Sequence, residues 1–149
     1  MSVDLYSQRV LELAADIPHI GKLTQADGYA RKLSRLCGST IEIEVCLDNG
    51  VVSQAAIEPK ACALGQASAS ILMRHLVGAR LEEIVQARDQ FKAMLKSGGA
   101  PPLGRFWELR YLESVKDYPP RHTSALLPFE AAVAAVLDAM HTKGIKQNA

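Results

Sequence analysis

Apolar residues near the N-terminus recur at helical spacing and predict a helix over residues 4–16. These residues are Tyr6, Val10, Leu13 and Ile17. Pro18 and Gly21 follow them and end the pattern. From Gly28 onward apolar and charged residues alternate instead, which predicts a strand over residues 29–36. The chain therefore opens with a packing helix and then changes to extended structure.

The clearest alternation comes next and predicts a β-hairpin. Apolar residues alternate with charged ones over residues 41–47, as they do in a strand with one buried face. Residues 48–50 read Asp-Asn-Gly, a sequence typical of tight hairpin turns, and a second strand follows over residues 51–58 until Pro59 closes it. Cys46 falls on the charged face of the first strand, where we expect it to serve packing rather than chemistry.

The remaining apolar patterns are helical. They predict helices over residues 63–77, 81–95 and 106–115, with glycine and proline residues between them. The pair at 119–120 is Pro-Pro and predicts an extended approach to the last helix. Pro128 is expected in the first turn of that helix, where a proline costs no hydrogen bond.

This order of elements indicates an α+β fold. We expect a small three-stranded antiparallel sheet packed against about four to five helices. The chain has 149 residues, of which 48% are hydrophobic, and it contains no linker long enough to separate two domains. We therefore interpret residues 1–149 as a single domain.

Charge and composition narrow the function classes. Lys and Arg number 17 against 16 Asp and Glu, so net charge favours neither a nucleic-acid partner nor a membrane surface. No signal-peptide pattern opens the chain, and no run reaches the roughly 18 apolar residues of a membrane span. The three cysteines are an odd number and too few for a disulfide scaffold. We therefore expect reduced thiols and a protein of the cytoplasm.

Two of the cysteines fall at junctions between elements. Cys62 follows the hairpin at the start of a predicted helix, where free backbone N–H groups and the helix dipole favour a thiolate over a thiol. Cys37 lies in a turn after the first strand. Loop ends on a rigid sheet commonly carry chemistry, so both thiols are candidates for metal binding or sulfur chemistry.

The motifs around these cysteines resemble those of the NifU/IscU-type iron–sulfur cluster assembly scaffolds, from about Leu5 to Met140. Residues 18–23 read Pro-His-Ile-Gly-Lys-Leu, similar to the Pro-x-Asn-x-Gly sequence that follows the first helix in that family. Residues 37–39 read Cys-Gly-Ser at the place of Cys-Gly-Asp. Residues 62–72 resemble the family's Cys-x-x-x-x-Ala-Ser-x-Ser block. The segment before the last helix is closer to the SufU branch.

The resemblance implies a ligand set that this chain fills only in part. Members of the family hold a metal or nascent cluster with three cysteines and a nearby aspartate or histidine, and a cysteine desulfurase supplies the sulfur. Cys37 and Cys62 match two of those cysteines. Ser124 stands at the place of the third, and Ser39 at the place of the aspartate. A serine hydroxyl is a poor ligand for iron or zinc, because it stays protonated near neutral pH.

Three ways of completing the site remain open. His122 lies one position out of register and could supply a nitrogen ligand. Alternatively, Cys37 and Cys62 of two chains could hold a two-iron cluster in a homodimer, or the protein could bind no metal. Ser124 and its neighbour Thr123 are also expected as helix-cap residues, and solvation at the surface is the plain alternative for His122.

The leading hypothesis is a scaffold-like protein that binds iron or a labile iron–sulfur cluster through Cys37 and Cys62 and is not an enzyme. One alternative is a degenerate scaffold that acts as a metal-free interaction or regulatory module. Another is a zinc-assisted sulfur acceptor, in which a thiolate takes a persulfide sulfur from the desulfurase.

Overall fold

The computed structural model describes residues 5–145 and confirms the α+β fold with a three-stranded antiparallel sheet. In chain order the elements are α1 (Gln8–Ala15), β1 (Gly28–Ser34), β2 (Ser39–Asp48), β3 (Val51–Lys60), α2 (Ala63–His75), α3 (Leu81–Ser97), the 3-10 segments η1 (Gly104–Asp117) and η2 (Pro119–Arg121), and α4 (His122–Thr142). The strands lie in the order β1, β2, β3.

The predicted hairpin is confirmed. Ile43 pairs with Ala30 on one side and with Ile57 on the other, and the alternating apolar residues of β2 are fully buried. Asn49 and Gly50 both adopt positive φ, 54° and 79°, as a tight hairpin turn requires. Pro59 does not end β3 as predicted, because this edge strand tolerates a proline and Pro59 still pairs with Ile41.

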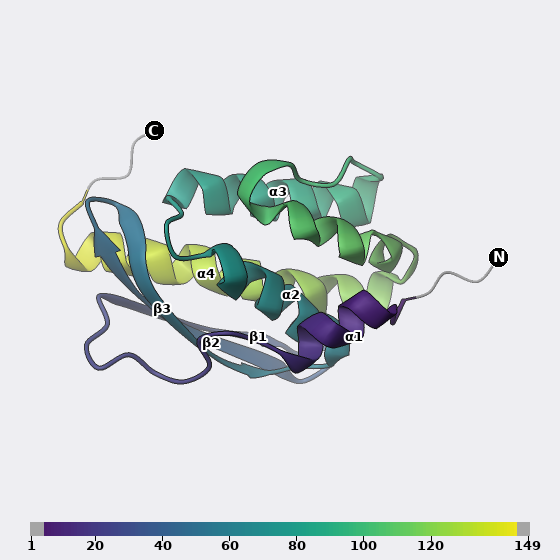
Figure 1. Cartoon of the computed structure of the whole chain (residues 1–149), viewed down its shortest axis with the longest axis horizontal. Helices are drawn as coiled ribbons and strands as arrows, with labels where there is room; N and C mark the ends of the chain where they lie inside the picture. Colours follow the sequence, from purple (N-terminus) through teal and green to yellow (C-terminus); the bar gives the residue numbers. More distant parts are fainter. Residues whose placement is uncertain (1–4, 146–149) are drawn as a thin grey trace.

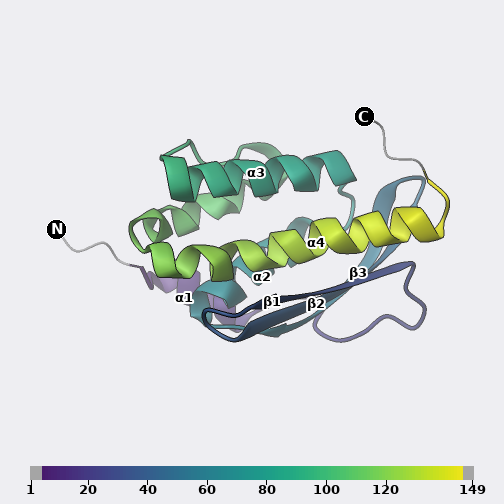
Figure 2. The same cartoon turned by 180° about the vertical axis from the view of Figure 1, so that it is seen from behind.

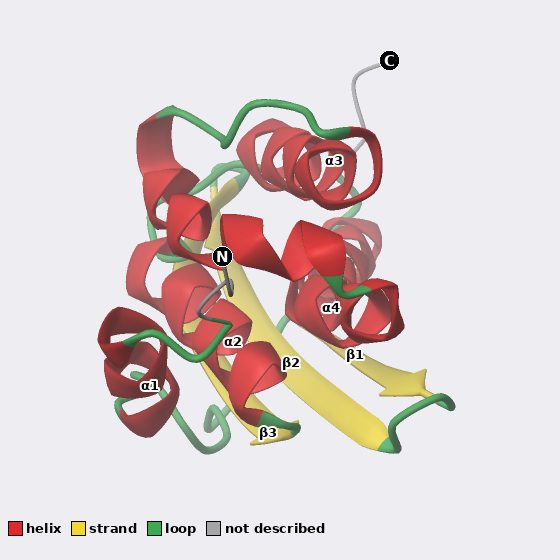
Figure 3. Ribbon diagram, turned by 90° about the vertical axis from the view of Figure 1, so that its right-hand side faces the viewer, coloured by secondary structure: helices red, strands yellow, loops and turns green. Residues whose placement is uncertain are grey.

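The helices cover one face of the sheet in two layers (Figures 1 and 2). The long helix α4 lies along β1 and β2, with α2 beside it and α1 beside α2. Helix α3 and segment η1 form the outer layer over α4 and α2. Figure 3 looks along the sheet at the end where the β1–β2 turn, the start of α2 and the start of α4 lie.

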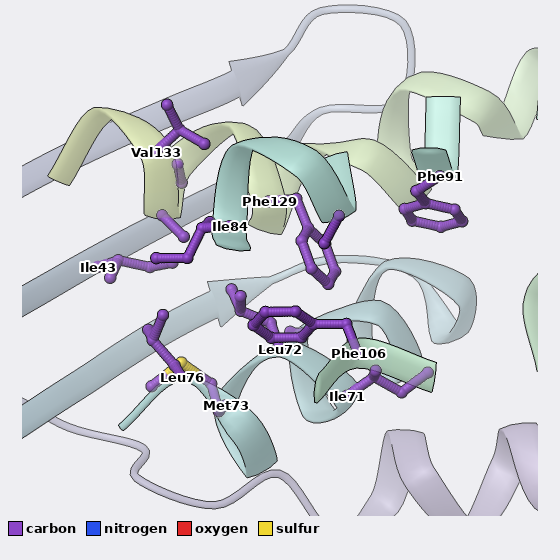
Figure 4. Close-up of a cluster of buried hydrophobic side chains, with 14 of the residues drawn as sticks. Ile43, Ile71, Leu72, Met73, Leu76, Ile84, Phe91, Phe106, Phe129 and Val133 are labelled. Atoms are coloured by element: carbon purple, nitrogen blue, oxygen red, sulfur yellow. The ribbon is translucent and has the colours of Figure 1, made fainter. Parts of the chain in front are cut away.

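The core joins these layers through aromatic contacts (Figure 4). The ring of Phe129 in α4 meets Phe91 of α3 and Phe106 of η1 edge to face, with centroids 5.7 and 5.5 Å apart. Leu72 and Met73 of α2 pack below them and are buried. Helix α4 is therefore packed between the sheet on one side and α3 and η1 on the other, which fixes its first turn relative to α2.

Two helix starts differ from the sequence prediction. Helix α1 begins at Gln8, because the Ser7 hydroxyl accepts a hydrogen bond from the Val10 N–H and caps the helix there; residue 4 lies outside the described residues. The pair Pro119 and Pro120 forms the 3-10 turn η2 instead of an extended segment. The fixed φ of proline suits the first positions of a 3-10 turn as well as extended chain.

Pro128 lies inside α4 and not in its first turn, so that prediction is wrong. Segment η2 delivers the chain at His122 already in helical conformation, which starts the helix early. Pro128 then removes the hydrogen bond that the Ser124 carbonyl would otherwise accept. Burial of the helix on both sides outweighs this local cost.

Helix α4 together with η2, over Pro119–Thr142, is long and apolar enough to cross a membrane by length and composition. In the structure 67% of the apolar 18-residue window within this segment is buried inside the protein. A core helix of this kind explains its composition.

Glu108 of η1 is a buried acid that ties three segments together. Its carboxylate accepts hydrogen bonds from Arg9 of α1 at 2.9 Å and pairs with His75 of α2 at 2.8 Å. Burial opposes ionisation, but the bonds from His75 and Arg9 outweigh it and hold the pKa of Glu108 below its ordinary value. The carboxylate therefore anchors α1 and η1 to α2.

Candidate functional site

Cys37 lies in the turn between β1 and β2, and Cys62 lies between β3 and α2, so both lie at the same end of the β2–β3 ladder. Cys37 is exposed in the turn between β1 and β2, where Gly38 adopts a φ of 73° that favours glycine. Cys62 is the N-cap residue of α2, as the sequence predicted, and is half-buried. Each thiol is thus positioned by the junction of a strand with the following turn or helix.

Ser124 of α4 lies between the two thiols. Its Oγ is 3.3 Å from the Sγ of Cys62, and the same hydroxyl is near enough to Cys37 to help lower the pKa of that thiol. The prediction that Ser124 or Thr123 caps the last helix is wrong, because that helix begins earlier, with Arg121 as its N-cap. Ser124 therefore sits within the first turn and is free to face the cysteines.

Two further hydroxyls surround Cys37. Its Sγ lies 3.3 Å from the Oγ of Ser34 and 3.0 Å from the Oγ of Ser39. Burial disfavours the Cys37 thiolate, but hydrogen bonding with Ser34, Ser39 and Ser124 outweighs it and lowers the pKa of Cys37 to about 7. Hydroxyls that donate to a sulfur stabilise its anion, so this site favours a thiolate on Cys37.

Gly65 in α2 makes the approach of Ser124 possible. A Cβ at Gly65 would lie 2.8 Å from the Cβ of Ala61 and 3.0 Å from the Oγ of Ser124. One turn further, Ser68 donates to the Ala125 carbonyl at 2.6 Å and ties α2 to the start of α4. Small residues in α2 thus bring the Ser124 hydroxyl to Cys62.

His122 is buried, with 4% of its surface exposed, so the alternative of a solvated surface histidine is wrong. Its Nε2 lies 2.9 Å from the carbonyl oxygen of Val115 and 3.2 Å from that of Lys116. Among residues 5–145 no three His, Cys, Asp or Glu side chains gather closely enough to hold a metal ion. Within one chain, His122 therefore does not join Cys37 and Cys62 in a ready ligand set.

Cys46 lies apart from this site. It is buried on β2, and its thiol donates to the Gln25 carbonyl at 3.1 Å beneath the segment that precedes β1. This environment is that of a packing thiol.

A groove of about 480 Å³ opens beside Cys37. Tyr6, Leu36 and Tyr118 line it, and each is partly exposed. Arg121 contributes a positive charge at the same groove. An incoming group can therefore reach the Cys37 thiol across an apolar surface.

Sequence reasoning missed Ser34 and Gly65. Ser34 stands three residues before Cys37, a spacing that a tight turn brings into contact, and the Gly38 N–H does bond the Ser34 carbonyl at 2.8 Å. Gly65 was visible as a glycine inside a helical pattern, which commonly marks a close approach.

The fold and the paired thiols define a small α+β domain with a cysteine-based site at one end of its sheet. Residues 5–124 match the family model of the NifU-like N terminal domain, and the chain belongs to this family. The resemblance found in the sequence motifs is confirmed.

Three relatives show the same likeness. A NifU-like protein (N-terminal) from Brucella abortus, described as nitrogen-fixing, is 43% identical with a TM-score of 0.90, over 93% of this chain and 96% of that one. The iron–sulfur cluster assembly scaffold protein IscU of Thermotoga maritima is 26% identical over 132 residues, 89% of this chain and 92% of that protein. A candidate SUF-system scaffold from Fervidobacterium islandicum, 20% identical, shares the fold with a TM-score of 0.82, over 91% of this chain and 99% of that one.

Proposed function

We propose that this protein is a scaffold-like carrier that holds iron or a labile iron–sulfur cluster, as cargo, on Cys37 and Cys62. The observation that supports it most is the placement of both thiols close to the hydroxyl of Ser124, which contacts Cys62 at 3.3 Å and helps lower the pKa of Cys37. Membership of the NifU-like family supports it as well, as does the similarity to the IscU scaffold of Thermotoga maritima.

The thiolates of this site can hold an iron–sulfur cluster only if two chains bind the same cluster. Iron–sulfur clusters are commonly held by four thiolates, and one chain offers Cys37 and Cys62. Ser39 and Ser124 are poor ligands, so we assign them to hydrogen bonds with the sulfurs. His122 would first have to leave the carbonyls of Val115 and Lys116. We therefore infer a homodimer that joins two Cys37–Cys62 pairs around a cluster. A zinc ion would bind to the same two thiolates of a chain.

A second candidate function is that of a sulfur acceptor. The exposure of Cys37, its pKa of about 7 and the groove beside it favour attack by this thiolate on a persulfide carried by a cysteine desulfurase. In both proposals the protein carries iron or sulfur stoichiometrically and is not an enzyme. Both need reduced thiols, so we place the function in the cytoplasm.

Anaerobic reconstitution with iron and sulfide tests the leading proposal. The wild-type protein should develop visible thiolate-to-iron charge-transfer absorption, and counting of iron and sulfide should give a cluster shared by two chains. Cys37→Ser and Cys62→Ser should each abolish the absorption. Cys46→Ala is the matched control, because it removes a thiol outside the site and should leave the absorption unchanged. No absorption in the wild type, or equal absorption in the double variant, would contradict the proposal.

A further inference from the structure

Cys37 and Cys62 lie just beyond the same end of the β2–β3 ladder. The last pair of that ladder joins Thr40 to Lys60, and Cys37 stands three residues before Thr40 while Cys62 stands two residues after Lys60. Both cysteines therefore continue from backbones that the ladder holds side by side. Neighbouring strands lie about 4.7–4.9 Å apart, comparable to the span of about 4.4–6.8 Å between the Cα atoms that a disulfide bridges.

The Ser124 hydroxyl shows that the two sulfur atoms, and not only the two backbones, lie near each other. It lies 3.3 Å from the Sγ of Cys62, and it is also near enough to Cys37 to help lower the pKa of that thiol. Both sulfurs therefore lie close to one hydroxyl group. Rotation about the side-chain torsions of Cys37, which sits in an exposed turn, can close the remaining distance.

The three cysteines of the chain differ in access. Cys37 is exposed and Cys62 is half-buried, so a small reagent can reach the first and the second is near it. Cys46 is buried against the Gln25 carbonyl on another part of the sheet. Only Cys37 and Cys62 are therefore placed to react with each other.

We propose that Cys37 and Cys62 form a reversible intramolecular disulfide by exchange with low-molecular-weight disulfides, of which glutathione disulfide is the test reagent. The inference rests on the proposed function in one respect: a closed pair withholds both thiolates from the cargo. The site would then accept iron or sulfur only in its reduced state.

The exchange balances in two steps. The Cys37 thiolate attacks one sulfur of the reagent disulfide, and the other sulfur leaves as a thiolate that takes a proton from water. Cys62 then loses its proton to water and attacks the sulfur of Cys37, displacing the second thiolate. Two cysteines are oxidised, and one reagent disulfide is reduced to two thiols.

The test uses the full chain, reduced and stripped of metal with a chelator, then incubated anaerobically with glutathione disulfide. Free thiols are alkylated under denaturing conditions, and the protein is digested with trypsin and analysed by mass spectrometry. Cleavage after Lys60 separates the two cysteines, so the disulfide joins peptides 36–60 and 61–74. Fragmentation distinguishes Cys37 from Cys46, which share the first peptide.

We expect the internal disulfide to exceed the Cys37–glutathione adduct by at least about tenfold, because the second thiol acts at a high effective concentration. A reducing agent should reverse it. Cys46→Ala should leave it unchanged, and Cys62→Ser should stop the reaction at the glutathione adduct of Cys37. Adducts that persist in the wild type, a disulfide that includes Cys46, or disulfides between chains would overturn the inference.

The outcome is separable from that of the proposed function. Cluster loading is measured on fully reduced protein and does not depend on disulfide formation. If the reduced protein loads a cluster and the disulfide never closes, only this inference fails. If the disulfide closes and the reduced protein takes up no iron, the proposed function fails instead.

Discussion

The hydroxyls around Cys37 make its reactivity depend on pH in a distinctive way. The pKa of this thiol is lowered from 9.0 to about 7. At neutral pH about half of the Cys37 side chains are then ionised, whereas about one per cent of thiols with the ordinary value are. The thiolate population is therefore roughly 50-fold larger.

The gain in reaction rate is smaller than this, because a thiolate of lower pKa is a weaker nucleophile. With a Brønsted coefficient of about 0.4–0.5, lowering the pKa from 9.0 to about 7 reduces the intrinsic reactivity of the anion roughly 6- to 10-fold. Cys37 should react about 5- to 8-fold faster than an ordinary thiol at neutral pH. Above the ordinary pKa the order reverses, and Cys37 should be the slower thiol.

Ser39→Ala removes the hydroxyl that lies 3.0 Å from the Cys37 sulfur and tests this reasoning. Loss of the donor raises the pKa of Cys37, so alkylation should slow at neutral pH and accelerate at alkaline pH. The assay is the rate of Cys37 alkylation by iodoacetamide against pH, in a Cys46→Ala background. Ser53→Ala is the control, because that serine is exposed on β3.

The dependence of the alkylation rate on pH is compared between the wild type and Ser39→Ala. The wild-type rate should rise with pH and level off above a midpoint near 7, and the midpoint of Ser39→Ala should be higher. A wild-type midpoint near 9.0, or identical midpoints in the two proteins, would refute the role assigned to the hydroxyls.

Three other substitutions have defined outcomes. Gly65→Ala should cost about 1 kcal/mol in urea unfolding, since crowding of Ser124 exceeds the gain in helix propensity; a more stable variant would contradict this. Glu108→Gln should cost about 1–3 kcal/mol at neutral pH, because His75 and Arg9 lose their charged partner. The pKa of Glu108 is lowered, so this stabilisation is lost as pH falls through it, and an undiminished difference in acid would refute the assignment. Ser124→Cys adds a third thiolate beside Cys62 and should slow loss of zinc to a chelator, and unchanged loss would place the metal elsewhere.

The sequence predicted the elements whose pattern is local. Alternation over residues 41–47 and the Asn49–Gly50 turn determine the hairpin, and the small residues after Cys62 place it at the helix start. Neither depends on distant contacts, so periodicity and turn chemistry suffice.

The start of the last helix could not be predicted from local patterns. Pro128 by itself favours a start nearby, yet packing of η2 and burial of His122 begin the helix earlier. That earlier start turns Ser124 toward Cys62, and Gly65 leaves the space for it. The approach of Ser124 to the cysteines therefore arises from tertiary packing, whereas the contact of Ser34 with Cys37 follows from a local turn.

Native mass spectrometry of the anaerobically reconstituted protein counts chains, iron and sulfide in one particle, so it shows directly whether two chains share a cluster. We predict a dimer that carries a cluster in the wild type and in Cys46→Ala. We predict metal-free protein in Cys37→Ser and in Cys62→Ser. Equal metal loading in the Cys37→Ser and Cys62→Ser double variant, or a wild-type protein that retains no metal, would contradict it.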